Sequence, residues 1–114
     1  MGTVTSSELP KVALYSAMNT FDIFNAMNKI ISDGNTVGNN VGRLGHGLGL
    51  QLTEPPSHRQ GDNTIIKENM VLTIEPGMEY ANGKMIVHEE NILIRKDGAE
   101  LITKRAPKEI PIIK

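Results

Sequence analysis

The sequence predicts an α+β fold in which helices pack on a mainly antiparallel sheet. Apolar residues recur at helical spacing within residues 11–34, whereas residues 42–103 carry short apolar runs separated by turn signals. The Asn82-Gly83 pair between two such runs is a strong hairpin signal. A chain of 114 residues is long enough for one hydrophobic core and too short for two, so residues 1–114 are expected to form a single domain.

The helical segment is expected to contain two helices. The first, Lys11–Met18, follows a polar, loose leader at residues 1–10. The second, Phe21–Ser32, is predicted to be capped by Thr20 and closed by Asp33-Gly34. Its apolar residues share one face, which is therefore expected to contact the sheet.

The glycine-rich stretch Gly42–Glu54 is predicted to be the first strand, and it carries His46. Gly45 and Gly47 leave the backbone on either side of His46 bare. Glycine within a strand often marks the close approach of a ligand or of another backbone, so these two glycines are candidate substrate-binding positions. His46 itself is either a functional residue or a core histidine with a satisfied ring, and this segment alone favours neither interpretation.

The chain after this strand is predicted to alternate between loops and strands. Pro55-Pro56 is expected to end the pairing of the first strand, and Ser57–Lys67 is expected to be an exposed, mobile loop in which His58 is solvated. Further strands are predicted at Asn69–Pro76, Met85–Arg95 and Glu100–Thr103, followed by a tail at residues 104–114 that packs over the surface.

Three side chains are candidate metal ligands: His46, Glu75 and Glu89. A hairpin that turns at Asn82-Gly83 brings Glu75 alongside Glu89, and cross-strand neighbours on one face lie about 4.5 to 5.5 Å apart. Two carboxylates at that separation repel each other unless they share a proton or hold a cation. One imidazole with two carboxylates suits a divalent transition metal. The alternative, in which both glutamates face solvent or pair with Lys or Arg, stays open.

The composition excludes several classes of protein. A net charge of -1 argues against nucleic acid as a partner. No apolar run approaches the roughly 20 residues of a membrane span, and Met1–Pro10 lacks the pattern of a signal peptide, so a cytoplasmic location is expected. The chain has no cysteine, so any metal must be held by His, Asp or Glu.

The motifs GHGLGL and TIEPG, followed by a glutamate, an apolar strand and a Lys-Asp-Gly turn, resemble the C-terminal half of the catalytic domain of M24 metallopeptidases. This family includes methionine aminopeptidase, Xaa-Pro aminopeptidase, prolidase and the non-peptidase creatinase. The similarity extends from about Val12 to about Pro107. It implies half of the family's pita-bread fold, with two helices on one face of a curved, mainly antiparallel sheet.

The resemblance also implies a ligand set. In this family, five side chains hold two divalent metals: two Asp from the first half of the domain, and a His and two Glu from the second. By motif, His46 looks like the histidine ligand, Glu75 like the first glutamate and Glu89 like the bridging glutamate. The implied cofactor is Mn, Co, Zn or Fe, and the implied reaction is hydrolysis of an amide next to proline or an N-terminal residue, with Glu75 as proton shuttle.

Two departures from the family pattern change the expected function. No pair of Asp-bearing strands precedes the helices here, so one metal ion or none is expected. The family's peptidases usually carry a second histidine in a Val-His-Glu run, which here reads Leu52-Thr53-Glu54. Thr53 is therefore a candidate substrate-binding residue, and His58 is a candidate substitute for the missing catalytic histidine.

The expected function is that of a truncated Xaa-Pro peptidase-like domain that is not a competent peptidase alone. One alternative is a metal-dependent Xaa-Pro dipeptidase or aminopeptidase that a partner chain completes. Another is a non-catalytic binding module with a vestigial site. The expected partner is the missing N-terminal half or a second copy in a homodimer, with a peptide as substrate of any active form; neither nucleic acid nor membrane is expected to bind.

Overall fold

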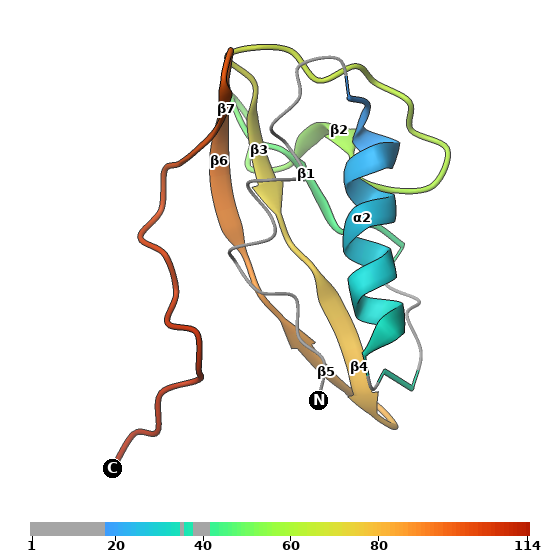
Figure 1. Cartoon of the computed structure of the whole chain (residues 1–114), viewed down its shortest axis with the longest axis vertical. Coiled ribbons are helices and arrows are strands. Elements are labelled where there is room, and N and C mark those ends of the chain that lie inside the picture. Colours follow the sequence, from blue (N-terminus) through green and yellow to red (C-terminus); the bar gives the residue numbers. More distant parts are fainter. Residues whose placement is uncertain (1–17, 35, 38–41) are drawn as a thin grey trace.

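The computed structural model describes residues 18–34, 36–37 and 42–114 of the chain (Figure 1). One helix packs along an antiparallel sheet, and a hairpin extends the sheet at one end. In chain order the elements are α2 (Thr20–Asp33), β1 (Gly45–Gly47), β2 (Glu54–Ser57), β3 (Val71–Ile74), β4 (Gly77–Ala81), β5 (Lys84–Val87), β6 (Glu90–Arg95) and β7 (Gly98–Leu101). The predicted α+β class is confirmed.

Helix α2 begins one residue earlier than the sequence pattern indicates. Asn19 is the N-cap: its side chain accepts from the backbone N–H of Asp22, whose carboxylate in turn accepts from the N–H of Asn19. The prediction that Thr20 caps the helix is wrong, because Thr20 is buried and donates its hydroxyl to the carbonyl of Asp62. The N–H of Gly34 closes the helix on the carbonyl of Ile31, as expected. Most of the predicted first helix, residues 11–17 of Lys11–Met18, lies outside the described residues.

The five strands of the main sheet run in the order β2-β1-β3-β6-β7, and every neighbouring pair is antiparallel. Strands β4 and β5 form a second, two-stranded unit that turns at Asn82-Gly83, as the sequence predicts. Ile74 pairs with Glu90, and Gly77 pairs with Val87, so the two units continue one register. Figure 1 shows β3 running on into β4 and β5 into β6 as one long hairpin.

The prediction of a single strand over Met85–Arg95 is wrong, because the ladder is interrupted at His88 and Glu89. The residue that faces His88 in the shared register is Pro76, which has no N–H to donate. A single bond bridges the gap, from the N–H of His88 to the carbonyl of Pro76 at 3.0 Å. Proline in a central position therefore divides the long hairpin into two ladders.

The prediction of one long strand over Gly42–Glu54 is also wrong. The stretch contains β1 (Gly45–Gly47) and ends at Glu54, the first residue of β2, and the residues between the two strands form a loop whose Leu50 and Leu52 are exposed. The chain pairs again through Pro55-Pro56, the dipeptide expected to end pairing. Proline is tolerated there because β2 is an edge strand, and its outer N–H groups have no ladder partner to lose.

Ser57 ends β2, and residues 58–67 form a loop that is not as fully exposed as its polar sequence indicates. Asp62 organises it by accepting hydrogen bonds from the N–H groups of Ser57 and Thr64. His58 and Ile66 are buried, so the prediction of a solvated His58 is wrong. Periodicity gives no signal for two buried residues separated by an irregular turn, which explains the error.

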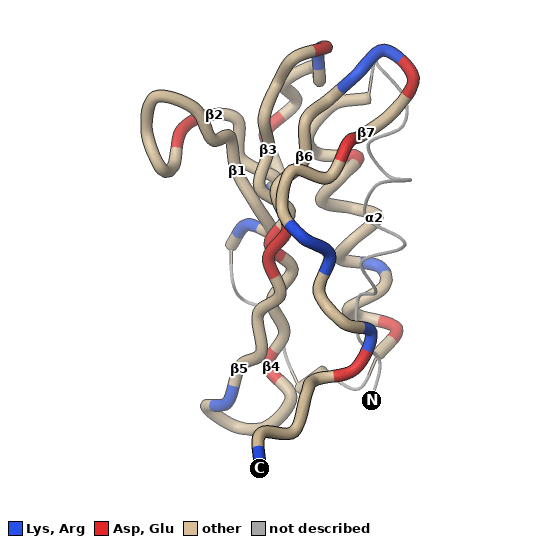
Figure 2. Tube along the Cα trace, turned by 90° about the vertical axis from the view of Figure 1, so that its left-hand side faces the viewer, with Lys and Arg blue, Asp and Glu red and all other residues tan. Residues whose placement is uncertain are grey.

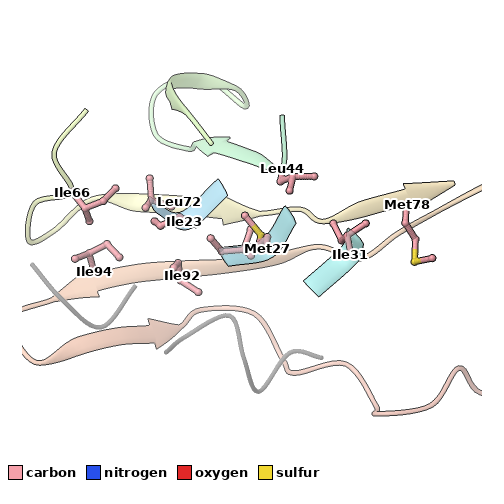
Figure 3. Packing of buried hydrophobic residues seen from close by; sticks show 10 residues of the cluster. Ile23, Met27, Ile31, Leu44, Ile66, Leu72, Met78, Ile92 and Ile94 are labelled. Carbon is pink, nitrogen blue, oxygen red and sulfur yellow. The ribbon is translucent and has the colours of Figure 1, made fainter. Parts of the chain in front are cut away.

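The hydrophobic core lies between α2 and one face of the sheet (Figure 3). The helix contributes Ile23, Met27 and Ile31 at helical spacing. Each such buried side chain contributes about 1.5 to 3 kcal/mol of transfer free energy. The remaining members of the core are Leu44, Ile66, Leu72, Ile74, Met78, Ile92 and Ile94.

The C-terminal region departs from the predicted boundaries. Strand β7 is Gly98–Leu101 instead of Glu100–Thr103, because it starts directly after the two-residue turn Lys96-Asp97. The last residues extend away from the sheet in Figure 1, and Ile110, Ile112 and Ile113 are exposed, so the end of the tail does not pack over the surface as expected, although Ala106 is half-buried. Basic and acidic positions are interspersed along the described trace in Figure 2. Within the described ranges, no helix has the length and apolarity to cross a bilayer.

Candidate metal centre

His46 occupies the middle residue of β1, between β2 and β3, and its side chain is 8% exposed. Its Nδ1 donates to the carbonyl of Gly47 at 2.8 Å, since a carbonyl oxygen can only accept. The neutral ring then carries an unprotonated Nε2 with a free lone pair. This Nε2 lies 3.5 Å from Oε2 of Glu75.

Glu75 follows directly after β3, and its backbone N–H donates to the carbonyl of Leu44 at 2.9 Å. That bond continues the β1–β3 ladder by one residue beyond the paired strands, which fixes the carboxylate beside His46. The Glu75 side chain is 35% exposed, so one side of it is open to solvent. A buried imidazole and a half-exposed carboxylate therefore converge at the end of β3.

The register of the sheet extends this group across three strands. His46 is paired with Thr73, and Thr73 with Asn91, whose side chain Oδ1 accepts a hydrogen bond of 2.8 Å from the Thr73 hydroxyl. Directly paired residues of antiparallel strands share one face, and alternate residues return to it. Glu75 and Glu89 therefore lie on the face of His46, opposite each other in the register that β3–β6 and β4–β5 share.

Glu89 does not join the other two side chains. It is exposed, and among residues 18–34, 36–37 and 42–114 no three His, Asp or Glu side chains lie close enough together to hold a metal ion. The structure thus brings together His46 and Glu75 and places Glu89 across from Glu75 on the same face. The three-ligand site stays a prediction.

The donor set fits a divalent cation. An imidazole lone pair and a carboxylate oxygen repel each other unless positive charge lies between them, as a proton or as a metal ion. The hydrogen bond from Nδ1 to a backbone carbonyl is the usual support of a histidine that ligates through Nε2. Nitrogen and oxygen donors without sulfur suit Mn, Co, Zn or Fe.

His58 lies close to His46 but in a different environment. It is fully buried, and neither ring nitrogen has a hydrogen-bond partner among the described residues. Burial, as the main cause, lowers the pKa of His58 to about 4, and the nearby His46 imidazole acts in the same direction. A neutral, enclosed ring is poorly placed to exchange protons with a substrate, so the catalytic role considered for His58 gains no support from its position.

Gly45 and Gly47 are buried, and the space beside their α-carbons is occupied by the protein itself. A methyl group on Gly45 would collide with the carbonyl of Thr73 and the ring of His58, and one on Gly47 would collide with the carbonyl of Pro55. Gly45 also has a φ of 143°, which side chains rarely adopt. The close approach that these glycines indicate is thus made by neighbouring strands, and their contact with a substrate stays a prediction.

Thr53 lies exposed in the loop between β1 and β2. This loop is held by Glu54, whose carboxylate accepts from the N–H of Gln51 at 3.3 Å. Thr53 is therefore exposed to solvent directly before β2. Its role in substrate binding also stays a prediction.

One notable residue lay outside the sequence prediction. Glu90 is buried, at 1% exposure, and its carboxylate lies 3.2 Å from Nε2 of His88. The available signal was an acidic residue inside the apolar run of β6, two positions after a histidine. Glu89, and not Glu90, is the position that the hairpin register brings alongside Glu75.

Comparison with known proteins identifies the family to which this arrangement of residues is similar. Residues 12–96 match the model of metallopeptidase family M24. The Xaa-Pro dipeptidase of Pyrococcus furiosus is 44% identical over 61 residues, which cover 54% of this chain and 18% of that relative.

Two solved structures share the fold. Prolidase from Pyrococcus furiosus has a TM-score of 0.74 and 33% identity, with 89% of this chain and 31% of that chain covered. An X-Pro aminopeptidase from Thermotoga maritima has a TM-score of 0.77 and 28% identity, with 94% and 30% covered. The chain thus spans less than a third of the length of each of these relatives.

The family match covers most of the chain, and it includes the histidine and glycine motif of β1, the end of β3 and the whole of β6. The structural likeness confirms that the chain has part of a pita-bread fold. The chain therefore belongs to metallopeptidase family M24.

Proposed function

We propose that this chain supplies the histidine and the two glutamates of a divalent-metal site in an Xaa-Pro peptidase-like domain, and that it is not a competent peptidase alone. The observation that carries the proposal is the approach of His46 Nε2 to Glu75 Oε2 at 3.5 Å, with Nδ1 committed to the carbonyl of Gly47. Glu89, opposite Glu75 in the register, is the third proposed ligand.

The roles of the residues follow from their surroundings. His46 is buried and fixed by its hydrogen bond, so it serves as the rigid ligand. Glu75 is half-exposed, so its carboxylate is able both to face a cation and to accept a proton from solvent or substrate. When bound, a divalent ion supplies Lewis acidity and a more acidic water.

The proposal that activity needs another polypeptide rests on the number of donors. Three donors hold one ion with open positions, whereas a two-metal site takes about five or six groups. Thr53 stands where the family's peptidases carry a histidine, and its hydroxyl cannot act as a cation at neutral pH. The relatives named Xaa-Pro dipeptidase and prolidase are more than three times as long as the part this chain matches.

Metal content tests the proposed site. The chain is exposed to Mn, Co, Zn or Fe and dialysed exhaustively, and the retained metal is measured by mass spectrometry. We expect about one ion per chain in the wild type and less than a tenth of that in His46→Ala and Glu75→Gln, because each removes a ligand.

Glu79→Gln is the matched control. Glu79 belongs to β4, and its carboxylate accepts from the N–H of Gly83 in the hairpin turn, away from His46. Retained metal should be unchanged in this variant. A wild-type chain that keeps no ion, or equal loss in the control, would contradict the proposed site.

A second candidate function is that of a metal-dependent Xaa-Pro dipeptidase completed by a partner chain. It is favoured by the two named relatives and by the short span of the match. With Mn or Co, we expect no hydrolysis of Xaa-Pro dipeptides by the chain alone. Hydrolysis should appear when a chain carrying two aspartate ligands is added, and it should be lost with Glu89→Ala. Activity of the isolated chain that depends on Glu89 would show instead that no partner is needed.

The remaining candidate, a binding module with a vestigial site, makes the opposite prediction for metal. Such a module keeps its fold but retains no ion, and the substitutions His46→Ala and Glu75→Gln leave both properties unchanged. The same metal measurement therefore separates it from the two metal-dependent candidates.

A further inference from the structure

Glu90 is a carboxylate in a row of apolar side chains. It is the first residue of β6, it is paired with Ile74, and it shares its face of the strand with Ile92 and Ile94. It is 1% exposed. Burying a carboxylate is strongly unfavourable unless hydrogen bonds and positive charge compensate for the lost water.

Three groups provide this compensation, and they come from both sides of Glu90 in the sequence. Nε2 of His88 lies 3.2 Å from Oε1, the hydroxyl of Thr103 donates to Oε2 at 3.3 Å, and the N–H of Ala106 donates to Oε1 at 3.4 Å. The hydroxyl of Thr103 also accepts from the N–H of Asn91 at 3.2 Å. We call this group of His88, Glu90, Thr103 and Ala106 the Glu90 clasp.

The clasp extends the sheet beyond β7. Strand β7 ends at Leu101, but the N–H of Ile102 still donates to the carbonyl of Asn91 at 2.9 Å. The same register places Thr103 beside Glu90. Beyond Thr103, the N–H of Ala106 donates to the Glu90 carboxylate, which is a bond to a side chain and not to a neighbouring strand.

Glu89 lies between the two members of the clasp on its own strand. His88 and Glu90 are joined to each other, and alternate residues of an extended chain point to opposite faces, so the side chain of Glu89 is directed to the face of Glu75. The ladder is interrupted at this point, with one backbone bond at His88, so strand pairing alone fixes Glu89 weakly.

We propose that Glu90 is a positioning residue for the metal ligand Glu89, and that it acts by tying residues 88–90 to the segment 102–106. This inference rests on the proposed function, because Glu89 is assigned there as a ligand. A buried polar cluster beside the break in the ladder at His88 and Glu89 is costly as a structural device, and hydrophobic replacement of such clusters is often neutral or stabilising. The direction that the cluster gives to Glu89 accounts for this cost.

The test is Glu90→Leu in the full 114-residue chain, with Mn²⁺ as the probe. Calorimetric titration measures affinity for Mn²⁺, thermal unfolding measures stability, and hydrogen exchange with mass spectrometry follows residues 88–91 and 102–106. We expect affinity to fall about tenfold, the effect typical of groups that orient a ligand. The melting temperature should not fall, and exchange should accelerate in both segments.

Glu100→Leu is the matched control. Glu100 lies on β7 and pairs with Arg95 at 3.2 Å, and both side chains are more than half exposed. All three measurements should be unchanged in this variant. If Glu90→Leu does not fold, Thr103→Val removes one donor of the clasp, with an expected loss of affinity of about twofold to threefold and faster exchange at residues 102–106.

The outcomes separate this inference from the proposed function. If the wild type binds Mn²⁺ and Glu90→Leu binds it equally well, the positioning role is wrong while the metal site stands. If Glu90→Leu loses Mn²⁺ affinity together with thermal stability, the positioning role is also wrong, because a residue with a purely structural role would have that effect. If the wild type binds no Mn²⁺, the proposed function fails, and the Glu89 positioning role fails with it whatever the exchange of residues 88–91 shows.

Discussion

At the scale of single residues, two neighbouring histidines have opposite surroundings. His46 has one nitrogen on a carbonyl and the other facing a carboxylate, whereas His58 is enclosed without a hydrogen-bond partner among the described residues. The first environment places the Nε2 lone pair beside a carboxylate oxygen, whereas burial in the second lowers the pKa of His58 and keeps its ring neutral. The same residue type therefore acts as a candidate ligand at one position and as a core side chain at the other.

The buried His58 predicts a dependence of stability on pH. Burial lowers its pKa to about 4 from about 6.5 in the unfolded chain. The unfolded state thus binds the proton more tightly, so its contribution to stability is complete above about pH 6.5 and declines as the pH falls toward 4. The integrated loss for this pKa difference is up to about 3 kcal/mol.

Urea unfolding between pH 7 and 4 measures this dependence. His58→Leu removes the titrating group while keeping an apolar side chain of similar size, so its free energy of unfolding should fall less steeply over the same range. The difference between the two curves isolates His58 from other groups that titrate there. Parallel curves would show that His58 is already protonated in the folded protein at pH 6.

At the scale of the element, the packing of β1 between its neighbours requires glycine at Gly45 and Gly47. It is three residues long, and it is enclosed by β2 and β3. The α-carbon of Gly45 faces the carbonyl of Thr73 and the ring of His58, with no room for a methyl group. The strand that carries His46 therefore fits into the sheet only because Gly45 has no side chain.

Gly45→Ala should destabilise the protein by more than about 2 kcal/mol, through steric overlap and an unfavourable φ of 143°. Gly61→Ala is the control, because Gly61 also has a positive φ, of 92°, but has open space around it. That variant should lose only about 1 to 2 kcal/mol. Chemical denaturation measures both, and equal losses would mean that crowding around β1 has no energetic weight.

The elements also show what pattern alone predicts. The Asn82-Gly83 turn, the buried strand β3 and the apolar face of α2 each follow from local chemistry: a turn that takes positive φ, a short apolar run, and a period of 3.6. The break at His88 and Glu89 does not, because it is caused by Pro76 in the facing strand. Pairing between segments is invisible in either segment by itself.

At the scale of the whole molecule, the β4–β5 end of the long hairpin exposes apolar side chains on the face opposite the core. Helix α2 packs on the core face, whereas Met85 and Val87, which alternate with Glu89, are exposed. Apolar side chains exposed together in this way commonly mark a contact surface. The face that carries the proposed ligands is thus also the expected face of association.

Dimerisation at micromolar concentration is the corresponding prediction. Light scattering coupled to gel filtration should give twice the mass of one chain, and Val87→Lys should shift the protein toward the monomer, because it places a charge within the contact. Ile112→Lys is the control, since Ile112 is exposed in the C-terminal tail, and this change should leave the mass unaltered. A monodisperse monomeric wild type would rule out the homodimer and leave a different partner for this face.

The sequence by itself determined the class of fold, the lineage and the order of the candidate ligands. These features depend on local patterns and short motifs: helical and strand periods, the Asn-Gly turn, and the residues around His46, Glu75 and Glu89. The tertiary structure alone decided which of these side chains meet. Burial of His58, pairing through Pro55-Pro56, exposure of Glu89 and the Glu90 clasp each depend on what a distant segment supplies, whether a carbonyl, a hydroxyl or an excluded volume. Such contacts join residues far apart in the chain, so no local pattern encodes them.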